Sequence, residues 1–554
     1  MKPPRLKGRA LTAARLAAEN PATSALLSDV LKKSLGLDRL VALPATARAP
    51  LPLDVTPVRG RAQPRELPDE GLAPTTRKSW PRSAEDLVAA FGSKKAGVEE
   101  VADRALYAVR KLGHNRVLNV LVANDEERSR AEAKLAAERH ANGQSLGPLD
   151  GVPYLVKDEV DVRGLPTRVG SLCESEEAKA ADATVVARLA RAGAVFVGKT
   201  VMTEWGLSPL GQNRAFSMPT NVHHAERLPG GSSTGSAVGV AMGAVPFAIG
   251  TDGGGSVRIP AALNGVYGIK PTFGRVSRTG SLTGSVGHIG PIGASPADLA
   301  AFLDAVSSEP DPADPFTLAA FAPPKGGFGC RLGAGVKKLR IGIPDSEWAD
   351  AHGTVEKACR SALAALEQAG AELVPISIPL ASVAAPIGYL TIGCESLGSH
   401  LDHYRHRRDK MGEDLRLSYA VLSGISATDF LDAQHLRAAL RAQTALALAD
   451  VDVIALPTTA TTAPKLPVHD RGLPFADTEA IDAMCRFNFL GNLTGLPAGT
   501  APVGVDEDGL PIGLQIVGDA WDEHIVIGVL AHLERLGVGA VVKPKAAHDL
   551  LAGS

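Results

Sequence analysis

The spacing of apolar and polar residues divides the chain into a part with helical periodicity and a part in which two periodicities alternate. Residues 85–145 place apolar side chains at helical intervals, with acidic and basic residues between them, which predicts helices with solvated faces. From residue 149 onward, short β-branched runs such as 195–200 and 247–252 alternate with helical segments. This alternation predicts βα units and an α/β fold with a helix-covered sheet. Later strands are expected within 337–345, 371–379, 449–464 and 511–519.

The first 80 residues differ in pattern from the rest of the chain. Residues 1–40 show helical periodicity, with Leu11 and Ala14 on one face, and carry several basic residues. A basic amphipathic helix can lie on a membrane, but we favour a helix that packs on the body or on a partner. Residues 41–80 are rich in Pro and Arg, which is typical of a linker. We therefore predict an extension and linker over residues 1–80 and one large domain over 81–554.

The composition is that of an ordinary globular protein. The 554 residues have a formal net charge of −2 and are 45% hydrophobic, so neither nucleic acid nor an acidic membrane is expected as a partner. No long uninterrupted apolar run and no secretory signal is found, which predicts a cytoplasmic protein without a membrane span. Five scattered cysteines without a CxxC motif indicate reduced thiols.

Three consecutive glycines precede a serine in the segment TDGGGSVRIP, residues 251–260. Such a run is either a flexible linker or a place where backbone N–H groups approach a ligand. In the second interpretation Ser256 is a nucleophile, and bare N–H groups beside it form an oxyanion hole for the oxygen that gains charge. The donors would belong to Gly253, Gly254, Gly255 and Ser256 itself.

A serine nucleophile needs a base to take its proton. Lys157 is the candidate because it ends an apolar run, where burial lowers the pKa of an amine, and Ser232 is placed to relay the proton. Residues 229–241, which contain Ser232, also have two other interpretations. A phosphate loop would need a lysine where Ser236 stands, and a G-x-S-x-G nucleophile elbow around Ser233 would need a preceding strand that the sequence does not indicate.

Several sequence blocks together resemble the amidase signature family. They lie within 149–171, 198–206, 228–280, 288–306, 450–461, 487–504 and 510–518 and follow the family's order. The resemblance covers about residues 85–540 and implies a large mixed β-sheet covered by helices on both faces. Thr234, Asn221–Val222 and Val286 depart from common family residues, which leaves the subfamily open.

The resemblance also implies a Ser–cis-Ser–Lys triad. Ser256 would be the nucleophile, Ser232 would follow a cis peptide bond after Gly231, and Lys157 would be the base. The backbone of Gly253, Gly254, Gly255 and Ser256 would form the oxyanion hole. Supporting roles fall to Asp252 and Arg258, which would brace the loop, and to Ser233, which would bond Lys157 or the loop. Met202 and Trp205 would line the substrate pocket.

The implied function is a serine amidohydrolase that cleaves a small-molecule amide without a metal or organic cofactor. One alternative is the glutamine-hydrolysing component of a tRNA-dependent amidotransferase, which would need partner subunits. Another is a catalytically silent binding protein, against which the intact triad argues. A lipid-amide hydrolase is a subclass of the main interpretation. The sequence leaves open the acyl and amine groups and the oligomeric state, for which a homodimer is one option.

Overall fold

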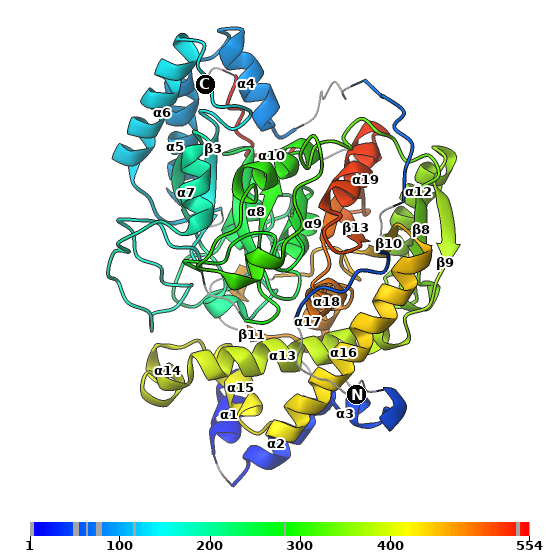
Figure 1. Ribbon diagram of the computed structural model, residues 1–554. Coiled ribbons are helices and arrows are strands. Elements are labelled where there is room, and N and C mark those ends of the chain that lie inside the picture. Colours follow the sequence, from blue (N-terminus) through cyan, green and yellow to red (C-terminus); the bar gives the residue numbers. More distant parts are fainter. Residues whose placement is uncertain are drawn as a thin grey trace.

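An eleven-stranded sheet runs through the protein (Figure 1). The computed structural model describes residues 5–20, 22–47, 55–62, 65–73, 80–114, 118–281, 284–466, 468–470, 473, 475–538 and 543–552. In spatial order the strands are β2 (Leu121–Ala123), β4 (Val195–Thr200), β3 (Pro153–Lys157), β5 (Phe247–Asp252), β7 (His288–Gly293), β6 (Tyr267–Lys270), β12 (Ala498–Val505), β13 (Pro511–Gly518), β10 (Val453–Pro457), β8 (Arg340–Ile343) and β9 (Glu372–Pro375). Strand β3 is parallel to β4 and β5, and β8 is parallel to β9 and β10, whereas the other neighbours are antiparallel.

Helices cover both faces of this mixed sheet. Gly499 of β12 faces Leu530 of one helix, whereas Gly513 of β13 and the side chain of Thr500 lie on the opposite face, against Ala262 of another. The expected α/β fold is therefore confirmed. The helices are α1 (Gly8–Glu19), α2 (Ser24–Ser34), α3 (Asp38–Val41), α4 (Ala84–Gly92), α5 (Val98–His114), α6 (Glu126–Ala141), α7 (Thr184–Arg191), α8 (Thr234–Ala241), α9 (Arg258–Asn264), α10 (Pro296–Val306), α11 (Asp345–Trp348), α12 (Gly353–Gln368), α13 (Ala384–Ser399), α14 (Leu401–His406), α15 (Glu413–Leu422), α16 (Ala427–Asp450), α17 (Thr478–Cys485), α18 (Phe489–Thr494) and α19 (Glu523–Arg535).

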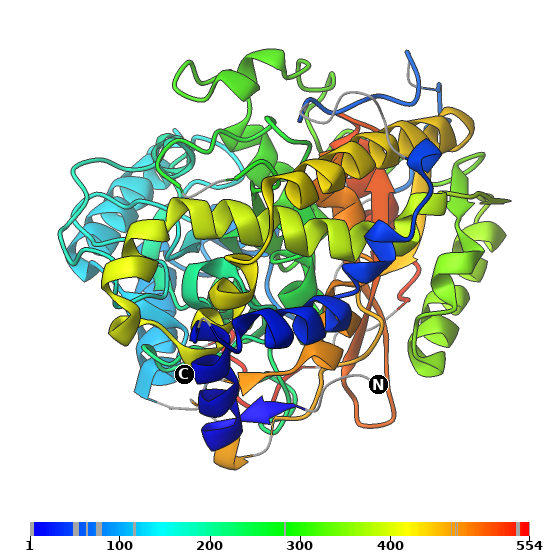
Figure 2. The same ribbon diagram turned by 90° about the horizontal axis from the view of Figure 1, so that it is seen from below.

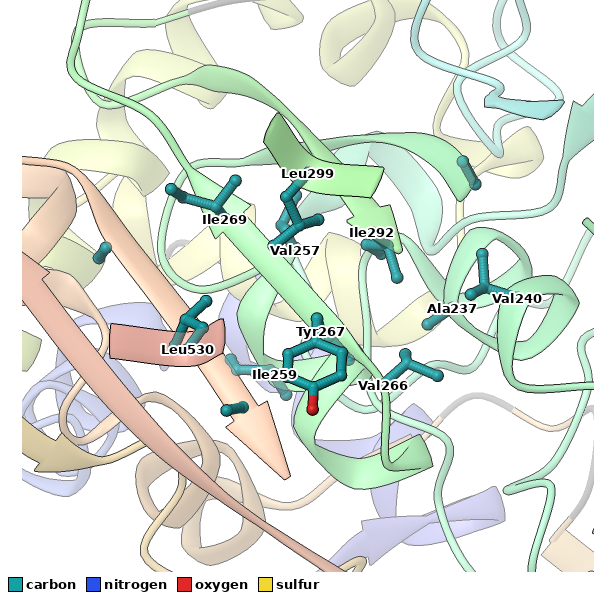
Figure 3. Close-up of a cluster of buried hydrophobic side chains, with 14 of the residues drawn as sticks. Ala237, Val240, Val257, Ile259, Val266, Tyr267, Ile269, Ile292, Leu299 and Leu530 are labelled. Carbon is teal, nitrogen blue, oxygen red and sulfur yellow. The ribbon is translucent and has the colours of Figure 1, made fainter. Parts of the chain in front are cut away.

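The core anchors the segment that carries the glycine run. Figure 3 shows side chains of α8, α9, α10, α19, β6 and β7 gathered in one buried cluster. Val257 and Ile259, which follow Ser256, are almost completely buried in it. Burial of these two side chains fixes the loop between β5 and α9 on the sheet.

Two parallel strands bring the candidate residues to one edge of the sheet. Strand β3 ends at Lys157 and its parallel neighbour β5 ends at Asp252. The carboxyl ends of parallel neighbours meet at the same edge, where ligands bind in α/β sheets. The loop after β5 therefore starts beside Lys157.

The N-terminal residues pack on the body, as favoured from the sequence. Helix α1 contacts α15, and β1 (Leu6–Lys7) pairs with β11 (Phe475–Ala476). The view from below in Figure 2 shows α1 and α2 beside α15, on the same side of the protein as α13 and α16. Residues 48–54, 63–64 and 74–79 of the expected linker lie outside the described residues. The described part is held by contacts, because Arg59 bonds Asp522 and Arg61 bonds Asp452.

One stretch of the described residues, Pro379–Ser399, is long and apolar enough to cross a membrane by composition. Of the 18-residue apolar window within this stretch, 61% is buried inside the protein. Its main part, α13, packs against α15, α16 and α18. This burial is typical of a core helix, because apolar residues around a whole helix are also expected where other helices surround it.

Candidate active site

Lys157 and Ser232 meet in the interior of the protein. Lys157 Nζ lies 2.6 Å from Ser232 Oγ, and both side chains are buried. Ser232 precedes α8, and the peptide bond between Gly231 and Ser232 is cis, as the resemblance implies. The two residues are 75 positions apart in the sequence. The fold joins them because β3 lies beside the loop that leads into α8.

Two further side chains contact the lysine. Lys157 Nζ donates to Thr251 Oγ1 at 2.5 Å and lies 3.0 Å from Glu159 Oε2. The Thr251 hydroxyl in turn donates to Glu159. Burial lowers the pKa of Lys157 below its ordinary value of 10.5, and the nearby Glu159 carboxylate opposes this shift. The amine thus has side-chain oxygen atoms of Ser232, Thr251 and Glu159 within hydrogen-bond distance.

The glycine loop places Ser256 at the surface of a cavity. Ser256 is part-exposed, and Gly255 has a φ of +117°, which only glycine adopts readily. A Cβ at Gly254 would lie 2.6 Å from the Phe489 ring, so this position also requires glycine. The backbone N–H groups of Gly253, Gly254 and Ser256 have no hydrogen-bond acceptor among the described residues.

One expected oxyanion donor is already engaged. The Gly255 N–H donates to Asp252 Oδ1 at 2.7 Å. Aspartate side chains commonly accept hydrogen bonds from nearby backbone N–H groups in turns and caps. The candidate hole is thereby reduced to the N–H groups of Gly253, Gly254 and Ser256.

Asp252 and Arg258 brace this loop from below. Both side chains are fully buried, with Arg258 Nη2 2.9 Å from Asp252 Oδ1. Asp252 also accepts from the Val257 N–H, and Asn492 Nδ2 donates to it. Arg258 is further bonded to Asn488, Gln515 and Asn492. The Arg258 guanidinium holds the pKa of Asp252 well below its ordinary value despite burial. The loop is thus fixed by a buried ion pair whose charges are compensated.

Of the other expected residues, Ser233 and Trp205 lie at the site, whereas Met202 does not. Ser233 Oγ donates to the Thr251 carbonyl and its N–H to the Ser256 carbonyl, so it bonds the loop and not Lys157. Two cavities border Ser256. Trp205 lines one of them, and Met202 lines neither. Met202 packs instead in a buried cluster with Trp205 and Tyr419, because its side chain turns into the protein.

Two cavities meet at Ser256. The first, of about 170 Å³, is lined by apolar residues and by neutral polar ones. Residues far apart in the sequence form its wall, namely Leu6, Leu35, Leu207, Ile392, Leu417, Val421, Ile481 and Phe489. The second, of about 110 Å³, contains Ser232, Glu159 and Glu395. Gly206, Leu207, Ser256 and Ile392 line both. A ligand with one apolar and one polar arm fits around Ser256.

The site also contains residues that the sequence analysis missed. Glu159 stands two positions after Lys157, and residues i and i+2 of an extended chain share a face, so a signal was present. Thr251 is the next-to-last residue of β5 and lies beside the end of β3, which a correct pairing of these strands would have indicated. Asn492 and Gln515 lie more than 200 residues from Arg258. No local pattern predicts such contacts.

This fold is shared with amide-hydrolysing enzymes. The family model described as Amidase matches residues 105–527, and the chain therefore belongs to the amidase signature family.

Curated relatives and solved structures agree with this assignment. The chain is 34% identical over 479 residues to a fatty acid amide hydrolase of Medicago truncatula, which covers 85% of this chain and 78% of the relative. It is 36% identical over 431 residues to a glutamyl-tRNA(Gln) amidotransferase subunit from Roseiflexus castenholzii, covering 73% and 86%. One similar solved structure was described in connection with the evolutionary origins of an s-triazine catabolic enzyme. It superposes with a TM-score of 0.77 at 30% identity and covers 83% of this chain and all of that chain.

Proposed function

We propose that the protein is a serine amidohydrolase that cleaves the carbon–nitrogen bond of linear amides with an apolar, chain-like acyl group. The observation that carries the proposal is the apolar cavity that ends at Ser256. No Asp, Glu, Lys or Arg is among the described residues that line it. Burying the methylene groups of an acyl chain there is favourable, whereas burying an unpaired charge is costly.

The proposed reaction starts with attack of Ser256 Oγ on the amide carbonyl carbon. The Ser256 proton passes to Ser232 Oγ as the Ser232 proton passes to the neutral Lys157 amine. When the carbon–nitrogen bond breaks, the proton returns through Ser232 to the leaving nitrogen, and the acyl group stays on Ser256. Water then attacks the ester by the same proton route, releases the carboxylic acid and restores Ser256.

The proposed oxyanion hole stabilises the tetrahedral intermediate of each half-reaction. The N–H groups of Gly253, Gly254 and Ser256 supply donors without a competing acceptor among the described residues. Preorganised donors of this kind lower the barrier because they need no rearrangement as the charge develops. The Asp252–Arg258 pair keeps the loop in that arrangement.

The apolar cavity also favours an apolar acyl substrate over glutamine. The curated relatives include both enzyme types at similar identity, so sequence similarity does not choose between them. Glutamine carries an ammonium and a carboxylate group beside its side chain, and both need charged or strongly polar partners. The apolar cavity offers neither kind of charge. A fatty acyl chain needs none.

A series of N-propyl amides with acyl chains from acetyl to dodecanoyl tests the proposal. We expect kcat/KM to rise about threefold to fourfold per added methylene until the cavity is filled, from about 0.8 kcal/mol per buried CH₂. Ile481→Trp replaces an aliphatic side chain of the cavity wall by a larger aromatic one. We expect this variant to lower the dodecanoyl-to-butanoyl ratio of kcat/KM by about tenfold or more.

The matched control for this series is Glu479→Trp, on the exposed side of the same helix α17. Its chain-length preference should equal that of the wild type. A flat response to acyl length, or a clear preference for L-glutamine included in the panel, would contradict the proposed acyl specificity.

Glu159 is proposed to position Lys157 and to set the pH range of activity. Neutral Lys157 is the active form, so kcat/KM falls as the pH drops through the pKa of Lys157. Because the Glu159 carboxylate raises this pKa, Glu159→Gln should shift the acidic limb of the pH–rate profile to lower pH. Glu176→Gln, at an exposed carboxylate, should leave the limb in place. A limb that stays in place or moves to higher pH in Glu159→Gln would exclude this role.

A further inference from the structure

The position of Ser232 distinguishes the two cavities at Ser256. Ser232 lines the polar cavity and is absent from the lining of the apolar one. In the proposed reaction the leaving nitrogen receives its proton from Ser232, so the leaving amine must lie on the Ser232 side. The apolar cavity then holds the acyl group, and the polar cavity holds the amine.

The polar cavity presents hydrogen-bond acceptors to this amine. Glu159 and Glu395 both line it. The imidazole of His288, which also lines it, contacts the Val286 carbonyl through Nδ1 at 2.8 Å. When Nδ1 carries the ring proton and donates it to that carbonyl, Nε2 is an acceptor. This buried Nε2 has no hydrogen-bond partner among the described residues. The Nδ1 of His400, which also lines the cavity, lies 2.8 Å from the Ser396 carbonyl, so its Nε2 is an acceptor when Nδ1 carries the proton.

The charges around the polar cavity leave it negative. Burial lowers the pKa of both His288 and His400, so they are neutral at pH 7. Among the residues that the structure describes, no Lys or Arg lines this cavity. Behind the wall lie two arginines and Lys157, which is neutral in the proposed reaction. Arg258 pairs with Asp252, Lys157 lies against Glu159, and the Ser285 hydroxyl accepts from Arg437 and donates to Glu395.

We infer that the polar cavity selects amides whose leaving amine carries a second, positively charged nitrogen, and that Glu395 is the carboxylate that recognises it. The substrates would be acyl derivatives of short diamines. Glu395 lies on α13 and accepts from the Ser285 N–H at 2.8 Å, which holds the carboxylate at the cavity wall. A flexible alkylammonium arm is attracted to a partly solvated carboxylate more than a neutral arm of equal length is. This inference rests on the proposed function, because it assigns the second arm of the same substrate.

Two lauroyl amides of equal length test the inference. N-(3-aminopropyl)lauramide carries the cation, and N-butyl lauramide is its neutral counterpart. We expect wild-type kcat/KM to be about tenfold higher for the cationic amide, and Glu395→Gln to reduce this ratio by about tenfold. Glu367→Gln, at an exposed carboxylate of α12 remote from the cavity, should keep the wild-type ratio. Raising the salt concentration should also lower the wild-type ratio, which tests the inference without any variant.

Each outcome decides the inference. Hydrolysis of both amides with a ratio near one, or with the neutral amide preferred, overturns it and leaves the proposed function intact. A wild-type preference that survives both salt and Glu395→Gln also overturns it. If neither amide is hydrolysed while Ser256 still reacts with a serine-directed probe, the proposed acyl specificity fails and this inference falls with it.

Discussion

Ser256→Ala is expected to lower kcat for a lauroyl amide by roughly 10⁴- to 10⁶-fold, the range seen when a hydrolase loses its nucleophile. The variant loses the atom that forms the acyl-enzyme, whereas the Asp252–Arg258 pair and the buried Val257 that hold the loop stay in place. The thermal unfolding midpoint should therefore stay close to the wild-type value. Steady-state hydrolysis and a melting curve on the same samples measure both quantities.

Ser361→Ala is the control for this variant, because Ser361 is exposed on α12. It should hydrolyse the amide at the wild-type rate. Retention of even a tenth of the wild-type kcat in Ser256→Ala would mean that another group attacks the carbonyl.

Lys157→Met is the second change with a large expected effect. It keeps most of the buried volume of the side chain but removes the amine that lies 2.6 Å from Ser232 Oγ. Loss of a general base typically costs about 10²- to 10⁴-fold, and we expect a loss near the upper end because the base serves both half-reactions. The remaining activity should also lose the acidic limb of the pH profile that Lys157 sets.

Lys199→Met is the matched control for Lys157→Met. Lys199 is also fully buried, lies on the neighbouring strand β4 and pairs with Asp158 at 2.8 Å, but it lines neither cavity at Ser256. Removing it should destabilise the protein by about 3–5 kcal/mol, as for other broken buried pairs, while folded protein retains most of its turnover. Equal loss of kcat in both variants would show that the Lys157 effect is one of folding alone.

The sheet could be predicted from the sequence because strand and helix periods are local. The apolar runs that end at Lys157 and Asp252 alternate with helical segments, so the presence of β3 and β5 follows from the pattern. The candidate triad could be predicted for a different reason. Lys157, Ser232 and the glycine run before Ser256 stand in short blocks whose residue types are unusual together.

The cavities could not be predicted, because their walls come from segments far apart in the chain. Leu6 and Leu35, Leu417 and Phe489 reach the same cavity only after α1 and α2 pack beside α15. Two details at the site were also out of reach of the motif. The Gly255 N–H is taken by Asp252, and Met202 points into the core. Each depends on side-chain geometry that residue types alone do not fix.

The central claim is that Ser256 is the reacting nucleophile, and intact-mass measurement after treatment with a fluorophosphonate probe tests it most directly. Such probes react with activated serines, so the measurement needs no knowledge of the substrate. The account predicts one adduct per chain on the wild type and none on Ser256→Ala. An adduct of the same stoichiometry on Ser256→Ala, or a folded wild type that takes up no probe, would contradict it.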